Sequence, residues 1–237
     1  MVRLCSICFG EYERLARVLL RSTKQNSPNV SLEVEYFNSI DKDILIQTKG
    51  LQQVYRENVF KTKIHCQIVN ESSDGELLCL IDCDTMVLND LSPIQNYDFD
   101  LAYTIRPLNV TFPFNSGVVF VRVSKETKEW YQQWYKNTLT LSTNPVLFSK
   151  LRRKYGRINQ CGLGMLLEQP HELKLQKLQC SIWNSIPDTW DEFNTHTKIV
   201  HILGQLRQAA LYGRGTILPK AKNILKIWKS FDLQEKQ

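Results

Sequence analysis

The chain has 237 residues, of which 43% are hydrophobic and 23% charged, so it suits one large α/β domain or two small ones rather than a disordered or fibrous protein. The net charge of +6 comes from scattered basic residues without a dense, aromatic-rich patch, which argues against a nucleic-acid partner. A phosphate-bearing substrate or an anionic membrane surface suits this mild excess. No run approaches the roughly 20 apolar residues that cross a bilayer, and no signal-peptide pattern is visible, so we expect a soluble, cytoplasmic protein.

The first half of the chain alternates strand and helix patterns. The elements expected here are a short buried strand at 2–9, a helix at about 12–22, a half-buried strand at 30–37 with Val30, Leu32, Val34 and Tyr36 on one side, a helix at about 57–70, and a strand at 77–81. The last of these is a continuous apolar run, which is typical of a central parallel strand covered on both faces.

The second half has a different pattern, with two strands close together and fewer clear helices. The elements expected here are strands at 100–105 and 117–123, a helix that Ser124 caps and that carries Trp130 and Trp134, an irregular region at 138–195, a short strand at 197–203 and a terminal helix at 221–231. Alternation followed by mixed strands predicts an α/β domain whose C-terminal half builds a substrate cleft.

The seven cysteines include a C-x-x-C pair, Cys5 and Cys8. A redox pair should lie at a helix N-terminus, whereas this one falls within the first predicted strand, and a zinc site would need a second pair at matching spacing. Buried thiols in a reducing compartment are therefore the favoured interpretation.

Two aspartates, Asp82 and Asp84, follow the apolar strand 77–81 directly. Residues i and i+2 of an extended segment point to the same side, so both carboxylates can aim at one spot while Cys83 faces away. Two adjacent like charges repel unless a cation lies between them, and Mn²⁺ or Mg²⁺ prefers such oxygen ligands. The alternative is a turn after the strand in which both acids are solvated.

The whole segment "IDCDTMVLNDL" (81–91) resembles the "LDADTLVLxDL" segment of nucleotide-sugar glycosyltransferases with the GT-A fold, above all those of family eight, which includes glycogenin and the bacterial lipopolysaccharide galactosyl- and glucosyltransferases. The resemblance spans roughly residues 1–210. It implies a single α/β domain with a Rossmann-like mixed sheet flanked by helices at 1–212, followed by a basic helix and tail at 213–237.

Further segments are similar to the family's in the same order. "FNSGVVFVR" (114–122) resembles "FNSGVMLI", whose asparagine contacts the donor sugar, a role that would fall to Asn115. "INQCGL" (158–163) takes the place of "DQDALN": Gln160 matches as a catalytic residue, but Asn159 and Cys161 replace the acids. A strand-entry turn and a plain helix are the structural alternatives for these two segments.

"HILGQLR" (201–207) resembles the family's "HxxGxxKPW", without its Pro-Trp. The resemblance implies that His201 completes a metal site with Asp82 and Asp84, that Gly204 lets the backbone approach the diphosphate, and that Arg207 grips it. Arginine in place of lysine keeps the charge and adds a bidentate phosphate contact.

The resemblance implies additional contacts to nucleotide or donor sugar. Tyr12 lies where the family stacks a tyrosine on the base, and Lys63 lies near a basic residue that touches the donor, although a solvated lysine is equally compatible with its spacing. The remaining implied contacts are Ser6, Phe9, Cys83 and Ser116. Trp183, Asn184 and Trp190 resemble an aromatic-rich loop where an acceptor sugar would stack, or belong to the core.

Together these features predict a metal-dependent glycosyltransferase that moves a sugar from a nucleotide-sugar donor, UDP-linked by resemblance, to a hydroxyl of a glycan, glycolipid or protein, with retention of configuration. A non-catalytic nucleotide- or sugar-binding module and a sugar nucleotidyltransferase are the alternatives, although the latter should carry a glycine-rich, lysine-bearing loop that "CFGEYERL" lacks. The tail "LPKAKNILKIWKSF" predicts an amphipathic helix that either packs on the domain or makes a peripheral membrane contact.

Overall fold

The computed structural model describes residues 1–107, 110 and 112–233. Its centre is a six-stranded mixed sheet in the order β2-β1-β3-β6-β5-β7. The strands are β1 (Val2–Phe9), β2 (Ser31–Phe37), β3 (Leu77–Asp82), β5 (Leu101–Ile105), β6 (Phe114–Arg122) and β7 (Leu175–Gln179). Strands β1, β2 and β3 are parallel, whereas β6 runs antiparallel to both β3 and β5.

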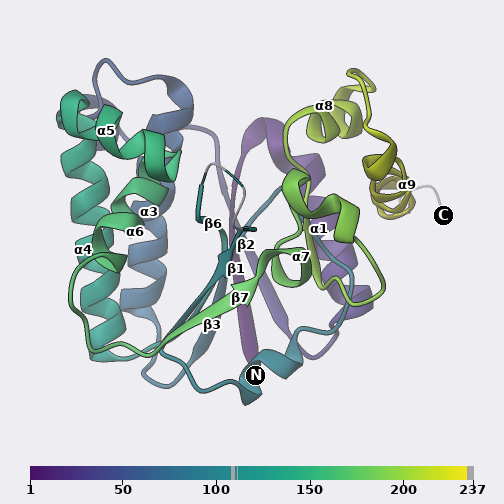
Figure 1. Ribbon diagram of the computed structural model, residues 1–237, viewed down its shortest axis with the longest axis horizontal. Helices are drawn as coiled ribbons and strands as arrows, with labels where there is room; N and C mark the ends of the chain where they lie inside the picture. Colours follow the sequence, from purple (N-terminus) through teal and green to yellow (C-terminus); the bar gives the residue numbers. More distant parts are fainter. Residues whose placement is uncertain (108–109, 111, 234–237) are drawn as a thin grey trace.

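Helices cover both faces of this sheet (Figure 1). On one side lie α3 (Gln53–Glu71), α4 (Lys125–Thr143), α5 (Pro145–Tyr155) and α6 (Ile158–Leu167). On the other lie α1 (Glu13–Asn26), α7 (Cys180–Trp183), α8 (Gly204–Tyr212) and α9 (Pro219–Asp232). The remaining helical segments are α2 (Lys42–Gln47) and the 3₁₀ turns η1 (Gly10–Tyr12), η2 (Ser92–Asn96) and η3 (Pro187–Glu192).

Strand β3 is buried on both faces, as its continuous apolar sequence predicts. Leu78 and Leu80 pack toward the core that α3, α4 and α6 share, whereas Leu77, Cys79 and Ile81 belong to the opposite core. Because its neighbours β1 and β6 run in opposite directions, β3 is the point where the sheet changes from parallel to antiparallel. The predicted α/β class with one mixed sheet flanked by helices is confirmed.

Most predicted elements are present, including the helix that Ser124 caps with its side chain. The prediction that Tyr36 shares the buried side of β2 is wrong, because this side chain is 52% exposed. The prediction of an irregular region at 138–195 is also wrong. It contains α5, which begins with Pro145 at the first helical position after the cap Asn144, and α6, whose residues are buried on nearly every side and therefore show no amphipathic period.

A second, two-stranded sheet joins distant parts of the chain: β4 (Thr85–Val87) pairs antiparallel with β8 (Ile199–His201). The terminal helix α9 packs against α1 and η3, and its apolar residues Ile224, Trp228 and Phe231 are buried in that contact. Residues 234–237 of the predicted tail lie outside the described residues.

All seven cysteines are buried and free, as the favoured interpretation of the C-x-x-C pair expects. Within the described ranges, each helix is too short or too polar to span a membrane.

Candidate active site

A cavity of about 590 Å³ opens where β1 and β3 end and β6 begins. Its walls come from the end of β1, helix α3, the turn after β3, the start of β6, the α5–α6 region and the start of α8. Ligand pockets commonly measure roughly 300–1,000 Å³ and lie beyond the carboxyl ends of parallel strands. The cavity is therefore the first candidate for a binding site.

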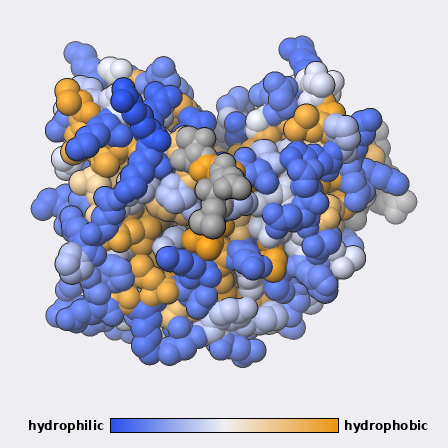
Figure 2. All heavy atoms as spheres, in the orientation of Figure 1, coloured by the Kyte–Doolittle hydropathy of each residue, from blue (hydrophilic) through white to orange (hydrophobic). Residues whose placement is uncertain are grey.

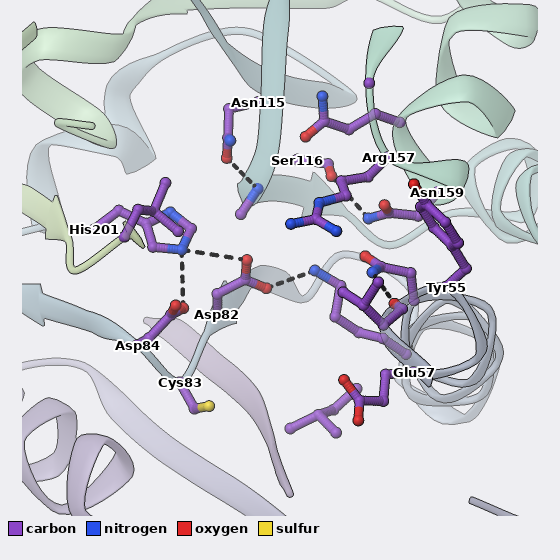
Figure 3. A pocket seen from close by; sticks show the side chains of 18 of the residues that line it. Tyr55, Glu57, Asp82, Cys83, Asp84, Asn115, Ser116, Arg157, Asn159 and His201 are labelled. Atoms are coloured by element: carbon purple, nitrogen blue, oxygen red, sulfur yellow. Dashed lines mark hydrogen bonds and ion pairs between the residues drawn. The ribbon is translucent and has the colours of Figure 1, made fainter. Parts of the chain in front are cut away.

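Three potential metal ligands meet at this edge (Figure 3). Asp82 is the last residue of β3, and Asp84 is the residue directly before β4. Strand β8 places His201 opposite Thr85, and the N–H of Ile202 donates to the Asp84 carbonyl at 2.7 Å. As a result, His201 Nε2 lies 2.9 Å from Asp84 Oδ1 and 3.5 Å from Asp82 Oδ2.

Asn184 orients the imidazole of His201. Its Oδ1 lies 3.1 Å from His201 Nδ1, so Nδ1–H donates to this amide and the ring is held with Nε2 toward the carboxylates. The amide nitrogen of Asn184 in turn donates to Thr104 Oγ1 at 3.0 Å and Asn115 Oδ1 at 2.9 Å. The fully buried Asn184 thus connects the histidine to the start of β6.

Gly117 makes room for the same imidazole. A Cβ at this position would lie 2.4 Å from His201 Cε1 and 2.8 Å from Asn115 Oδ1, closer than Cβ atoms come to other atoms in proteins. The backbone N–H of Gly117 also donates to Asn115 Oδ1 at 2.7 Å. The glycine is therefore a packing requirement of the site.

The two carboxylates are compensated by cations. Lys61 Nζ lies 2.6 Å from Asp82 Oδ1, and an Arg207 guanidinium nitrogen lies 2.9 Å from Asp84 Oδ2. Burial alone would raise the pKa of Asp84, but the charges of His201 and Arg207 outweigh burial and lower this pKa to about 2. Burial alone would lower the pKa of His201, but Asp84 and Asp82 outweigh it and raise this pKa.

The donor set fits a hard divalent ion. One ligand atom each from Asp82, Asp84 and His201 lies within 4.8 Å of the others, two of them carboxylate oxygens and one a nitrogen of an imidazole that Asn184 orients. Mn²⁺ and Mg²⁺ prefer carboxylate oxygens and keep further positions for water or phosphate. Cys83 points away from the three ligands and contacts Cys8 and Ala16 (Figure 3).

Polar side chains line the neighbouring part of the cavity. Asn115 uses its Oδ1 internally, which leaves its amide N–H groups for a ligand. Gln160 donates from Nε2 to the carbonyls of Tyr155 and Phe114, so its Oε1 is the end available to a ligand. Asn159 donates to Ser116 Oγ at 2.9 Å.

The structure brings most of the predicted site residues to one cavity. Those on its wall are Phe9, Tyr12, Asp82, Cys83, Asp84, Asn115, Ser116, Gln160, His201, Gly204 and Arg207. The Arg207 guanidinium lies over the Tyr12 ring at 5.2 Å. Gly204 has a φ of +57°, a conformation that favours glycine at the start of α8.

Two predicted contacts are not on the wall. Ser6 is buried within β1, and Lys63 points away and pairs with Asp41 at 2.6 Å. Trp183 and Trp190 are buried core residues rather than an exposed stacking surface, because Trp183 packs on Phe120.

Sequence reasoning missed three groups of wall residues or supports. Lys61, rather than the predicted Lys63, contacts Asp82. Positions two apart on a helix point in different directions, so the apolar periodicity of α3 could have shown which of the two lysines faces the sheet. Asn184 was expected in a sugar-stacking loop, and its contact with His201 carries no signal in the sequence, since the two residues are 17 positions apart in different elements. The third group consists of Arg106, Arg152 and Arg157.

Comparisons with known proteins agree on the fold. No family model and no curated sequence matches the chain. Among solved structures, the glycosyltransferase GlyE of Streptococcus pneumoniae TIGR4 matches with a TM-score of 0.65 and 14% identity over 98% of this chain; the chain spans only 61% of GlyE. A glycosyltransferase involved in glycosylation of the major capsid of PBCV-1 matches with a TM-score of 0.61 and 14% identity, covering 87% of this chain and 96% of its own. The galactosyltransferase LgtC, solved with donor and acceptor sugar analogues, matches with a TM-score of 0.60 and 12% identity, covering 99% of this chain and 96% of its own.

The chain therefore has the GT-A fold of glycosyltransferases, as the resemblance at 81–91 implies.

Proposed function

We propose that the chain is a metal-dependent glycosyltransferase that transfers a sugar from a nucleoside diphosphate sugar, with UDP as the first nucleotide to test, to an acceptor hydroxyl with retention of configuration. The observation that carries the proposal is the meeting of Asp82, Asp84 and His201 in a cavity at the edge of a GT-A sheet. The reaction requires a site that neutralises the negative charge of a diphosphate leaving group. Asp82, Asp84 and His201 could hold a divalent cation that does so.

In this proposal the three residues hold Mn²⁺ or Mg²⁺, which when bound acts as a Lewis acid on the diphosphate. Arg207 and the backbone at Gly204 contact the same diphosphate. Tyr12 borders the base. Asn115 donates to the donor sugar.

Next to the sugar, the Oε1 of Gln160 faces the anomeric region, where positive charge develops as the glycosidic bond breaks. Gln160 and its neighbours also exclude water from this region, so that the acceptor hydroxyl rather than water attacks. The direction of attack is part of the proposal, and NMR of the product's anomeric proton tests retention.

A non-catalytic binding module is the second candidate, favoured by one observation. Asn159 and Cys161 stand where the resembled family has acids, and burial raises the pKa of the Cys161 thiol to about 12, so it supplies no charge there. Metal-dependent hydrolysis of a UDP-sugar without acceptor separates the two candidates, because only an enzyme releases UDP.

A cytoplasmic location and the division at residue 212 stay predictions. A glycan, glycolipid or protein acceptor is equally compatible with the site. Peripheral membrane contact through α9 loses support, because the apolar face that would enter a membrane, Ile224, Trp228 and Phe231, is buried against the domain.

The first experiment is calorimetry of UDP binding with and without Mn²⁺. We expect metal-dependent binding that Asp84→Asn weakens by more than about 100-fold, since even changes around a metal's ligands cost roughly 10–100-fold. Asp98→Asn is the matched control, because Asp98 is 84% exposed and, within the described residues, its ion-pair partner is Lys174 alone. Binding that does not need the metal, or that Asp84→Asn leaves intact, would contradict the proposed site.

A further inference from the structure

The cations on the cavity wall are unevenly compensated. The wall carries Lys61, Arg106, Arg152, Arg157 and Arg207. Three of these five have a carboxylate partner: Lys61 pairs with Asp82, Arg207 with Asp84, and Arg106 with Asp188. Among the described residues, Arg152 and Arg157 have none.

Both unpaired arginines belong to the α5–α6 side of the cavity. Arg157 precedes α6 as its N-cap and reaches into the middle of the pocket (Figure 3). Arg152, on α5, holds its guanidinium 5.5 Å from the centre of the Tyr55 ring, which is itself buried against Phe148. Arg152 is exposed, and this ring contact keeps its guanidinium beside the cavity.

The third acid of the wall, Glu57, does not neutralise them. It lies on α3 and accepts a hydrogen bond from Gln53 at 3.0 Å. The α5–α6 side thus keeps two positive charges, for which the described residues offer no carboxylate.

A buried polar atom on the same side also lacks a partner. Asn159 is 2% exposed, its Nδ2 donates to Ser116, and its Oδ1 has no hydrogen bond within the described residues. Buried polar atoms are nearly always paired, so an unpaired one on a cavity wall indicates a ligand that supplies the donor. A sugar hydroxyl is such a donor.

The positive charge continues outward along α5. Lys150, Arg153 and Lys154 are exposed on this helix, and only Lys154 has an acidic partner, Glu168, in the described part of the chain. Hydrophilic side chains lie beside apolar ones in this region of the surface (Figure 2), where Val146 at the start of α5 is also exposed. A ligand that approaches the cavity from this side meets positive charge before it reaches the pocket.

We propose that the acceptor is an anionic sugar, which carries a phosphate or a carboxylate that Arg152 and Arg157 bind while Asn159 accepts from one of its hydroxyls. This inference rests on the proposed function, which assigns the opposite end of the cavity to the donor. There the metal ligands, Arg207 and Gly204 serve the diphosphate, and they come from β3, the turn after it, β8 and α8 rather than from α5 and α6. Arginine binds both oxyanions through its bidentate fork.

The test is calorimetry on the full chain loaded with UDP and Mn²⁺, so that the donor end is occupied. Three matched probes are titrated: glucose, glucose 6-phosphate and glucuronic acid. We expect at least one charged probe to bind about tenfold or more tightly than glucose, since hydrogen bonds to charged groups are stronger than neutral ones. The two charged probes distinguish a phosphate-bearing acceptor from a uronic acid.

Two variants locate the effect. Arg152→Gln with Arg157→Gln should remove the preference for the charged probe, whereas Arg153→Gln should keep it, because Arg153 lies on the same helix but outside the cavity wall. Equal affinity for all probes would overturn the inference, as would an equal loss in Arg153→Gln. Weaker UDP binding without a change in probe preference would assign the arginines to the donor and overturn it too. If wild type binds neither UDP nor another nucleoside diphosphate with Mn²⁺, the proposed function fails, and the probe series on the unliganded protein still decides whether the arginines bind anions.

Discussion

The two ends of the cavity differ in how their charges are compensated. At the β3–β8 end, each carboxylate has a cationic partner within 3 Å, Lys61 for Asp82 and Arg207 for Asp84, and His201 lies between the two acids. At the α5–α6 end, Arg152 and Arg157 have no acidic partner in the described residues. The charges of the first end are therefore compensated within the protein, whereas those of the second end are available to an anionic ligand.

This difference has an energetic consequence. Removing one member of a buried charge network leaves the others without a partner, which typically costs about 3–5 kcal/mol. Removing an exposed cation that has no partner costs the folded protein almost nothing. Substitutions at the β3–β8 end should therefore affect both stability and metal binding, whereas those at the α5–α6 end should affect only ligands.

Among substitutions of residues that are not themselves metal ligands, the largest effect is expected from Gly117→Ala. The new Cβ would lie 2.4 Å from His201 Cε1, so the imidazole must move away from Asp84. We expect Mn²⁺ affinity to fall by more than about tenfold and unfolding free energy to fall by about 1–3 kcal/mol, the usual cost of overpacking. Calorimetry with Mn²⁺ and thermal denaturation measure the two.

Gly10→Ala is the matched control for this change. A Cβ at Gly10 has only Asn38 Oδ1 near it, at 4.0 Å, which is ordinary contact. If Gly117→Ala binds Mn²⁺ as tightly as Gly10→Ala does, then His201 is not a ligand, and the β3–β8 end is a structural ion-pair network.

A smaller effect is expected from Asn184→Ala. Without the Asn184 amide, Nδ1–H of His201 loses its acceptor, and the imidazole is no longer held with Nε2 toward the carboxylates. Residues that orient metal ligands contribute roughly 10–100-fold to metal affinity, and we expect a loss at the lower end because Asp82 and Asp84 remain.

Asn89→Ala provides the comparison for Asn184→Ala. Asn89 also donates two hydrogen bonds from its amide, in its case to the carbonyls of Thr195 and Thr197, but it lies outside the cavity. Both variants should lose some thermal stability, and only Asn184→Ala should weaken Mn²⁺ binding. A loss of Mn²⁺ affinity in both would reduce the role of Asn184 to packing.

The β3–β8 end could be predicted from the sequence to a large extent, because its signal is local. An apolar strand that runs directly into Asp82 and Asp84 indicates a metal site on physical grounds alone. His201 is 117 positions from Asp84, and only a resemblance between whole segments connected them. The structure shows how these distant residues meet, because β8 pairs with β4. A three-residue strand that is buried throughout has no alternating pattern, so the sequence does not reveal this pairing.

The α5–α6 end could not be predicted in the same way. Helix α6 is buried nearly all round, so its sequence lacks the amphipathic period that marks a helix, and the region was expected to be irregular. Arg152 and Arg157 look like ordinary surface residues in the sequence. What distinguishes them is a place on the cavity wall with no acidic partner among the described residues, which depends on the packing of α5 and α6 beside the sheet.

Lys61→Met is expected to have the smallest effect, with opposite signs on stability and on metal binding. In the metal-free protein, Lys61 compensates Asp82 at 2.6 Å, so its removal leaves two carboxylates facing each other and lowers thermal stability. The same ammonium competes with a metal ion for Asp82 Oδ1. We therefore expect Mn²⁺ alone to bind about two- to fivefold more tightly, the equivalent of ~0.5–1 kcal/mol for a partly exposed ion pair.

Lys63→Met separates this prediction from a general effect of charge. Lys63 is on the same helix and loses a similar ion pair, with Asp41, but it does not line the cavity. It should lower stability slightly and leave Mn²⁺ affinity unchanged. If Lys61→Met instead weakens Mn²⁺ binding, the ammonium holds Asp82 in position for the metal rather than competing with it. In that case the β3–β8 end depends on its cations even when the metal is bound, and the contrast with the α5–α6 end becomes sharper.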